Sequence, residues 1–423
     1  MSVPNEHLLH VVMNGQIIGD VQRTGPRRIR LLYSDARLRE TFTPLSVSMP
    51  GSSSRYSQAA VEPWLTGLLP DRPETLRQWR RQFAITDNTV FSLLRHVGED
   101  VAGAAQFVRP ERIEAVLNAP GVLEGLDGPR IADMMRRTLA NLPPMPAGHA
   151  HGKFSLAGAQ AKIALHRIKD GWSDPSGSVP STHIVKPAIP GRPDQDLVEA
   201  VTLRAAANLG LRVAHCWIEE FADERAIVVA RFDRVQRPNG RWVRVHQEDV
   251  CQALGLSPTR KYESQGGPTA ATVASLVRRV SHRPDDDLHQ LAQALVFNWL
   301  TCGTDAHARN YSLLLSTSTV RLSPLYDLNS YLAYGDGAGS ALSMSVAGTF
   351  EAERISAEDW VRFAPALLVD PEWLREEIER QRGGVLDALG DAASSDDIAA
   401  YDSRVVARLL ANAEKWLART LTF

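Results

Sequence analysis

Residues 298–315 read Asn-Trp-Leu-Thr-Cys-Gly-Thr-Asp-Ala-His-Ala-Arg-Asn-Tyr-Ser-Leu-Leu-Leu. An apolar helix is predicted to end at Gly303, and a polar loop and then an apolar strand follow it. A second apolar run at 320–322 predicts a hairpin with this strand, and the hairpin leads to Asp327. The stretch therefore predicts a helix, a polar loop and a hairpin, with acidic residues before and after the hairpin.

The polar loop carries Asp305 and Asn310 at an offset of five residues. Protein kinases have the same offset in their loop H-R-D-x-x-x-x-N, because phosphoryl transfer needs a carboxylate near the attacking hydroxyl and oxygen ligands for magnesium. Asp327 follows the hairpin, where kinases carry a second metal-binding carboxylate. Taken alone, the loop also fits an ordinary turn in which Asp305 is a cap and Asn310 is left-handed.

The order of the upstream elements favours the kinase interpretation. A hairpin is predicted around Gly158, with strands over 153–156 and 162–166, and a Ser/Pro/Gly-rich loop over 173–181 leads to the next strand. That strand carries Lys186 at its end. A kinase needs a hairpin over the phosphates, then a lysine on the following strand.

A helix over 194–209 carries Glu199, which we predict to pair with Lys186. Two strands follow, at 216–221 and 226–230, and then Asp233 in a hinge between two arginines. Asp233 either binds ribose hydroxyls or pairs with the neighbouring arginines. Each residue alone also fits a solvated surface position, but the set occurs in the order that a kinase requires.

The N-terminal region predicts strands and short helices. Asn14-Gly15 between two apolar runs is a strong hairpin signal, and a helix near 90–94 and a strand over 104–108 follow. Three prolines within 143–146 predict an extended spacer. We therefore expect an α+β protein with three parts: an N-terminal subdomain over 1–142, a small lobe over 150–235, and a mostly helical lobe over 236–423.

The composition is that of an ordinary globular protein. The 423 residues are 44% hydrophobic and 23% charged, with a net charge of -2, which gives no reason to expect direct nucleic-acid binding. The three cysteines lie far apart and lack metal-ligand spacing. Neither a signal peptide nor a run of 18 apolar residues is visible. We expect a cytoplasmic protein with no membrane segment.

At these motifs the sequence resembles the HipA family of bacterial serine/threonine kinase toxins of type II toxin–antitoxin systems. The matching segments include the Asp305 loop and a segment that begins at Lys261-Tyr262. The others are 10–19, 97–104, 154–162, 183–187, 231–234 and 246–255. The resemblance implies a two-lobed protein-kinase-like fold that uses ATP and Mg²⁺.

The resemblance also implies roles for individual residues. Asp305 would orient or deprotonate the acceptor hydroxyl, Asn310 and Asp327 would hold the metal, and Lys186 would contact the α- and β-phosphates. Ser155 matches a serine that such kinases autophosphorylate. The remaining residues implied to line the ATP site are Gly158, Ala159, Gln160, Phe232, Asp233, Gln247 and His307.

The family likeness finally implies a growth-inhibiting toxin that phosphorylates an aminoacyl-tRNA synthetase and itself. Its partner would be a HipB-like helix-turn-helix antitoxin, through which it reaches DNA indirectly. Two alternatives stay open. The order Asp-x-His-x-x-Asn also resembles phosphatidylinositol kinases, so a lipid or small-molecule kinase is one. A nucleotide-binding pseudokinase that acts as a partner-binding module is the other.

Overall fold

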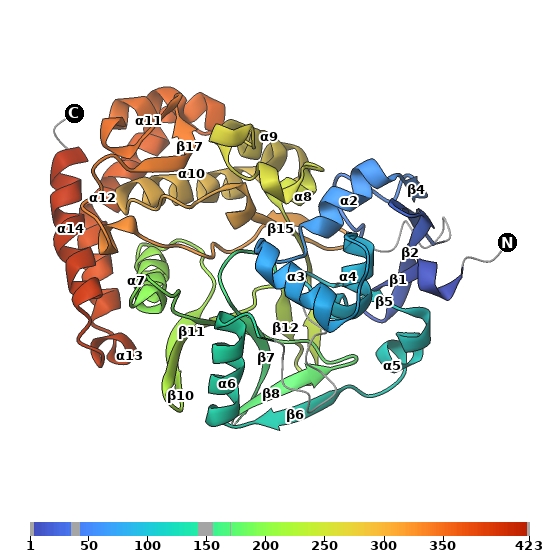
Figure 1. Cartoon of the computed structure of the whole chain (residues 1–423). Helices are drawn as coiled ribbons and strands as arrows, with labels where there is room; N and C mark the ends of the chain where they lie inside the picture. Colours follow the sequence, from blue (N-terminus) through green and yellow to red (C-terminus); the bar gives the residue numbers. More distant parts are fainter. Residues whose placement is uncertain (1–3, 35–42, 143–154, 170, 421–423) are drawn as a thin grey trace.

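The computed structural model describes residues 4–34, 43–142, 155–169 and 171–420. The predicted Pro-rich spacer at 143–146 and residues 153 and 154 of the predicted phosphate hairpin lie outside these ranges. The fold is α+β and has two sheets in its N-terminal half and a mostly helical C-terminal half (Figure 1). None of the helices in the described ranges is both long enough and apolar enough to cross a bilayer.

The first sheet is antiparallel and is built from the predicted hairpin. Asn14 and Gly15 both have positive φ, of 50° and 79°, which suits the tight turn between its two long strands. In spatial order the strands are β4 (Arg55–Tyr56), β3 (Arg28–Tyr33), β2 (Gln16–Gly25), β1 (Leu8–Met13) and β5 (Ala105–Val108). The predictions of a hairpin and of a strand over 104–108 are confirmed.

Helices α2 (Gln58–Thr66), α3 (Pro73–Gln82) and α4 (Val90–Val97) accompany this sheet. Trp64 from α2 and Phe91 from α4 are fully buried in one hydrophobic cluster with Phe107 of β5. The N-terminal region therefore has its own core, and the helix expected near 90–94 is present.

The second sheet forms the small lobe. Its spatial order is β10 (Cys216–Phe221), β11 (Glu224–Ala230), β9 (His183–Pro187), β7 (Ile163–Ile168), β8 (Gly171–Ser176) and β6 (Val122–Leu126). Helix α6 (Gly128–Leu139) packs on it through Ile131 and Met135. The expected boundary at 142 groups β6 and α6 with the first sheet, whereas their pairing and packing place them with the second.

Two local predictions for this lobe are wrong. Ser155 and Leu156 are not in a strand. The Ser155 amide donates its hydrogen bond to the carbonyl of Asp100 in the N-terminal region, and not to a strand of this sheet. Gly158 forms an isolated parallel bridge with Pro70 instead of turning a hairpin. The Ser/Pro/Gly-rich segment at 173–181, predicted as a loop, begins within β8: Ser173 pairs with both β6 and β7, and residues 174–176 pair with β6. We call residues 155–162 the phosphate loop.

The C-terminal half is mostly helical, as predicted. Its helices are α8 (Val250–Ala253), α9 (Ala270–Val280), α10 (Pro284–Leu300), α11 (Ala357–Phe363), α12 (Pro371–Ala393), α13 (Asp396–Ala399) and α14 (Arg404–Thr420). A three-stranded sheet, β14 (His246–Asp249), β15 (Ser312–Leu315) and β16 (Val320–Leu322), contains the predicted hairpin. The loop between α10 and β15 carries Asp305 and Asn310.

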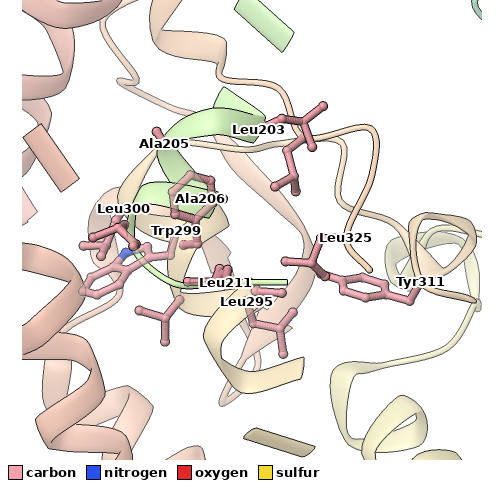
Figure 2. Close-up of a cluster of buried hydrophobic side chains, with 14 of the residues drawn as sticks. Leu203, Ala205, Ala206, Leu211, Leu295, Trp299, Leu300, Tyr311 and Leu325 are labelled. Atoms are coloured by element: carbon pink, nitrogen blue, oxygen red, sulfur yellow. The ribbon is translucent and has the colours of Figure 1, made fainter. Parts of the chain in front are cut away.

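Helix α7 (Gln195–Asn208) joins the two lobes through one hydrophobic core. Leu203 and Ala206 of α7 lie in the same cluster as Leu295 and Trp299 of α10 (Figure 2). Because α7 carries Glu199 and α10 leads into the polar loop, this core fixes the two halves of the predicted site relative to each other.

Candidate functional site

A cleft of about 670 Å³ lies between the lobes. Its walls come from the phosphate loop, the hinge after β11, and the loop between α10 and β15. All four residues on which the kinase hypothesis depends line this cleft: Lys186, Asp305, Asn310 and Asp327. The chain therefore brings together side chains that are up to 141 positions apart.

Lys186 is held between two carboxylates. Its ammonium nitrogen donates to Glu199 at 2.7 Å and to Asp327 at 2.8 Å. Burial lowers the pKa of Lys186, but Asp327 and Glu199 outweigh this and raise it above its ordinary value. Burial likewise raises the pKa of Asp327, whereas Lys186 and Lys162 hold it well below its ordinary value. Both groups are therefore charged at neutral pH.

Asp305 is exposed at the mouth of the cleft. It lies on a loop that is stabilised by hydrogen bonds between its own residues. The backbone carbonyl of Asp305 accepts hydrogen bonds from the His307 amide at 2.9 Å and from the Asn310 side chain at 2.8 Å. The Asp305 carboxylate accepts a hydrogen bond from the Tyr262 hydroxyl at 2.7 Å. Its carboxylate thus already binds a hydroxyl group, which is the contact that an acceptor substrate would make.

Asn310 and Asp327 offer oxygen ligands to a cation in the cleft. The Asn310 amide nitrogen is engaged by the Asp305 carbonyl, so the amide oxygen is the atom left to bind a metal. Within the described ranges there is no group of three or more His, Cys, Asp or Glu side chains able to hold a metal ion. One amide and one carboxylate suit Mg²⁺, which takes few protein ligands and completes its shell with phosphates and water.

The hinge residue Asp233 is locked in an ion-pair network. Its carboxylate accepts from Arg231 at 2.9 Å and lies 3.0 Å from Arg234, so the pairing with neighbouring arginines is the alternative that the structure supports. It also accepts from the Gly103 amide and from Gln247. Burial raises the pKa of Asp233, but the two arginines hold it well below its ordinary value. With the side chain only 2% exposed, its oxygens are occupied by protein donors rather than directed at a ribose.

The other expected nucleotide residues line the same cleft. Phe232 is half-buried, and its ring centre lies 5.3 Å from that of Tyr326. His307 is buried, and its Nδ1 atom has no hydrogen-bond partner within the described residues. Gln160 donates to the Pro187 carbonyl and to Gln195, which anchors the phosphate loop to the lobe beneath it.

The cleft contains a second lysine besides Lys186. It is Lys162, the last residue of the phosphate loop, for which the sequence pattern predicted no role. Lys162 donates from its ammonium group to the Ala157 carbonyl at 2.7 Å. A Cβ atom at Gly158, whose φ is +106°, would lie 2.7 Å from this ammonium nitrogen, so glycine lets the lysine pass under the loop. Burial and the nearby Lys186 lower the pKa of Lys162 to about 8. Two ammonium groups thus converge on one part of the cleft, which suits an anionic ligand.

Ser155 lies fully buried at the start of the phosphate loop. Its hydroxyl donates to the Leu68 carbonyl at 2.8 Å. The hydroxyl is therefore inaccessible to any acceptor or donor in the cleft while the loop is seated in this way.

The sequence did not predict a role for several further residues near the cleft. They belong to the N-terminal region or to segments without a recognisable motif. Asp71 pairs with Arg309 and with Lys261, and Arg309 also pairs with Asp249. The segment that begins at Lys261-Tyr262 resembles the family, but its residue spacing predicts no role for it. Its closeness to Asp305 is visible only in the folded chain.

Comparison with known proteins matches two family models to this chain. The description "HipA-like C-terminal domain" fits residues 154–389, and "HipA N-terminal domain" fits residues 9–108. A protein of Sinorhizobium fredii named as a candidate kinase, Y4mE, is 35% identical over 360 residues, which are 84% of this chain and 85% of that protein.

The serine/threonine-protein kinase toxin HipA of Shewanella oneidensis is 29% identical over 402 residues, covering 88% of both chains. A solved complex of HipA, HipB and operator DNA from Shewanella oneidensis contains a chain of similar fold. The TM-score is 0.81 at 26% identity, and the match covers 97% of each chain. The similarity therefore spans the N-terminal region and both lobes.

Proposed function

The chain belongs to the HipA family of serine/threonine kinase toxins, and from this premise we propose how its own residues carry out the kinase reaction. The cleft binds ATP with a magnesium ion, and the γ-phosphoryl group passes to a serine or threonine hydroxyl of a protein. The observation that carries this proposal is the convergence of Lys186, Asp305, Asn310 and Asp327 on one cleft.

Each residue has a task that follows from its surroundings. Lys186 is charged, buried and fixed by Glu199, so it presents a positioned ammonium group to the nucleotide phosphates. Asp305 is exposed and already accepts a hydrogen bond from a hydroxyl, so it orients the acceptor and takes its proton. The backbone at Phe232 meets the adenine, and Asp233 holds the hinge in place rather than touching the ribose.

Asn310 and Asp327 would hold the magnesium ion together with the phosphates. When bound, the ion neutralises charge on the phosphate oxygens. Lys162 and the backbone of Gly158, Ala159 and Gln160 would lie along the phosphates on the opposite side of the cleft. The two lysines and the two metal ligands make this part of the cleft complementary to a triphosphate.

We further propose the finer assignments that the family likeness implies. The acceptor is an aminoacyl-tRNA synthetase, the kinase also phosphorylates its own Ser155, and the reaction takes place in the cytoplasm. The partner is a HipB-like helix-turn-helix antitoxin, and support comes from the Shewanella oneidensis complex of HipA with HipB and operator DNA. A net charge of -2 suits a chain that reaches DNA through such a partner.

Asp305→Asn tests the reaction directly. It keeps the size of the side chain but removes the base, and we expect phosphoryl transfer from labelled ATP to fall by about 10²- to 10⁴-fold. Binding of a fluorescent ATP analogue should persist, which separates chemistry from binding. An unchanged transfer rate would remove Asp305 from the mechanism.

A cytoplasmic extract offered as acceptor distinguishes the classes of substrate. Label in a protein of synthetase size would support the proposed acceptor, whereas label in the lipid fraction would favour the lipid-kinase alternative. Nucleotide binding without transfer to any acceptor would favour the pseudokinase alternative.

A further inference from the structure

A short turn of the N-terminal region, residues 67–71, contacts both loops that face the cleft. It follows α2 and reads Gly-Leu-Leu-Pro-Asp. This region has its own sheet and hydrophobic core, so the turn reaches the cleft from a separately packed unit. Gly67 and Asp71 line the cleft beside the phosphate loop and the Asp305 loop.

On one side the turn holds Arg309, the residue immediately before Asn310. The guanidinium of Arg309 donates to the Gly67 carbonyl at 2.7 Å and pairs with the Asp71 carboxylate. Its third contact is with Asp249 at 2.8 Å. The Arg309 side chain is only 4% exposed, so these partners replace water almost completely.

Asp71 extends this contact to a second segment beside Asp305. Lys261 donates to Asp71 at 2.9 Å, and its neighbour Tyr262 donates to Asp305. The carbonyl of Lys261 also accepts from the Ala308 amide at 3.2 Å, within the Asp305 loop. Burial raises the pKa of Asp71, but Arg309 and Lys261 outweigh this and lower it, so the carboxylate stays charged.

On its other side the same turn holds the phosphate loop through its backbone. The Leu68 carbonyl accepts from the Ser155 hydroxyl at 2.8 Å, and the Asp71 amide donates to the Gly158 carbonyl at 3.1 Å. The backbone bridge between Pro70 and Gly158 lies between these two contacts. The phosphate loop is thus held by backbone groups of the turn, whereas the Asp305 loop is held by the Asp71 carboxylate together with the Gly67 carbonyl.

We propose that the 67–71 turn couples the two loops, with Asp71 as a positioning residue that acts through Arg309 on Asp305 and Asn310. In this arrangement the N-terminal region is part of the kinase machinery, because the reactive geometry exists only while the turn is seated against both loops. The inference rests on the proposed function of Asp305 and Asn310, and it adds a role for a region outside the two kinase lobes.

The test is Asp71→Asn, which removes the charge but leaves the backbone amide that binds the phosphate loop. We expect kcat to fall on the order of 100-fold, as misplacement of reacting groups can cause, while KM for ATP changes less than threefold. Asp71→Glu should recover part of the loss. Asp87→Asn is the matched control, since Asp87 pairs with Arg23 at 2.7 Å in the same region away from the cleft.

Amide hydrogen exchange gives a second readout that does not require activity. In Asp71→Asn we expect faster exchange across 305–310 with little change across 155–162, and no such pattern in Asp87→Asn. Arg309→Lys, which keeps the charge but loses the forked contacts, should reproduce the effect if Asp71→Asn fails to fold. If Asp71→Asn matched Asp87→Asn both in exchange at 305–310 and in kcat, the coupling would be overturned. If the wild type were inactive but Asp71→Asn still showed faster exchange at 305–310, only the proposed chemistry would be contradicted.

Discussion

The ammonium group of Lys186 bridges the lobes by contacting Asp327, 2.8 Å away and 141 positions later in the chain. Its other partner, Glu199, belongs to the same lobe and is completely buried, whereas 35% of the Asp327 side chain is exposed. The two contacts therefore differ in kind. The pair with Glu199 fixes the lysine from behind, and the pair with Asp327 faces the cleft that is proposed to receive the nucleotide.

This difference predicts the stability of variants at the buried pair. Lys186→Met leaves the carboxylate of Glu199 buried without its main partner, and we expect a loss of about 3–5 kcal/mol in the free energy of unfolding. Lys186→Met combined with Glu199→Leu should recover much of that loss, because no charge is then left buried. Urea unfolding of the single and double variants measures this coupling, and strictly additive effects would contradict it.

A second prediction concerns Tyr262, whose hydroxyl donates a hydrogen bond to the Asp305 carboxylate. If a protein acceptor must displace this hydroxyl, Tyr262→Phe should lower KM for the acceptor by up to about tenfold, equivalent to ~1.4 kcal/mol. The ring remains and keeps its edge contact with His307, whose centre lies 5.1 Å away. Steady-state kinetics with varied acceptor at saturating ATP measure the effect, and a raised KM would instead make Tyr262 part of the acceptor site.

The sequence was sufficient to predict strands β7, β9, β10 and β11 of the small lobe and the helix that carries Glu199, because apolar periodicity and glycine stops are local signals. It did not predict β6 and β8 of the same sheet. It also placed Lys186 and Asp327 as candidates for one site, since the order of elements matches that of a kinase. Their meeting in one cleft needed the hydrophobic core that α7 and α10 share, in which Leu203 and Leu295 belong to one buried cluster. Membership of this shared core has no signal within either segment.

The errors have a common physical origin in contacts across the chain. The predicted hairpin around Gly158 is absent because the partners of this segment are Pro70 and Asp100, which lie far away in sequence. For Asp233 the sequence left two interpretations open, ribose binding or pairing with the neighbouring arginines. One of its partners, the Gly103 amide, comes from the N-terminal region and is not visible in the local sequence. Periodicity within a segment carries no information on partners supplied by another region.

The buried hydroxyl of Ser155 leads to a prediction about the phosphate loop. The Ser155 hydroxyl now donates to the Leu68 carbonyl. A phosphate at this position carries about -1.5 to -2 charges, and the carbonyl oxygen would repel it because both groups are hydrogen-bond acceptors. Ser155→Glu should therefore release residues 155–162 and weaken ATP binding. Ser155→Ala is the matched control, and we expect it to lose only about 1–3 kcal/mol of stability.

Limited proteolysis, together with titration of a fluorescent ATP analogue, follows both consequences of Ser155→Glu. We expect new cleavage within 155–162 and weaker binding for this variant only. Phosphopeptide mapping of the wild-type protein after incubation with ATP should find the same serine modified. A Ser155→Glu variant that binds the analogue as the wild type does would contradict the release of the loop.

The lowered pKa of Lys162, about 8, predicts opposite pH trends for binding and for stability. Anionic phosphates favour the ammonium form, so above pH 8 the dissociation constant for ATP should rise by up to tenfold per pH unit, because the free protein must first take up a proton. The unfolded chain keeps the ordinary value of 10.5, so the contribution of Lys162 to stability rises between pH 8 and 10.5 as the folded protein sheds a disfavoured charge. Lys162→Arg, which stays charged over this range, should bind ATP with a flat pH profile. Isothermal titration in buffers of different ionisation enthalpy counts the protons taken up, and no uptake near pH 9 in the wild type would remove Lys162 from the phosphate site.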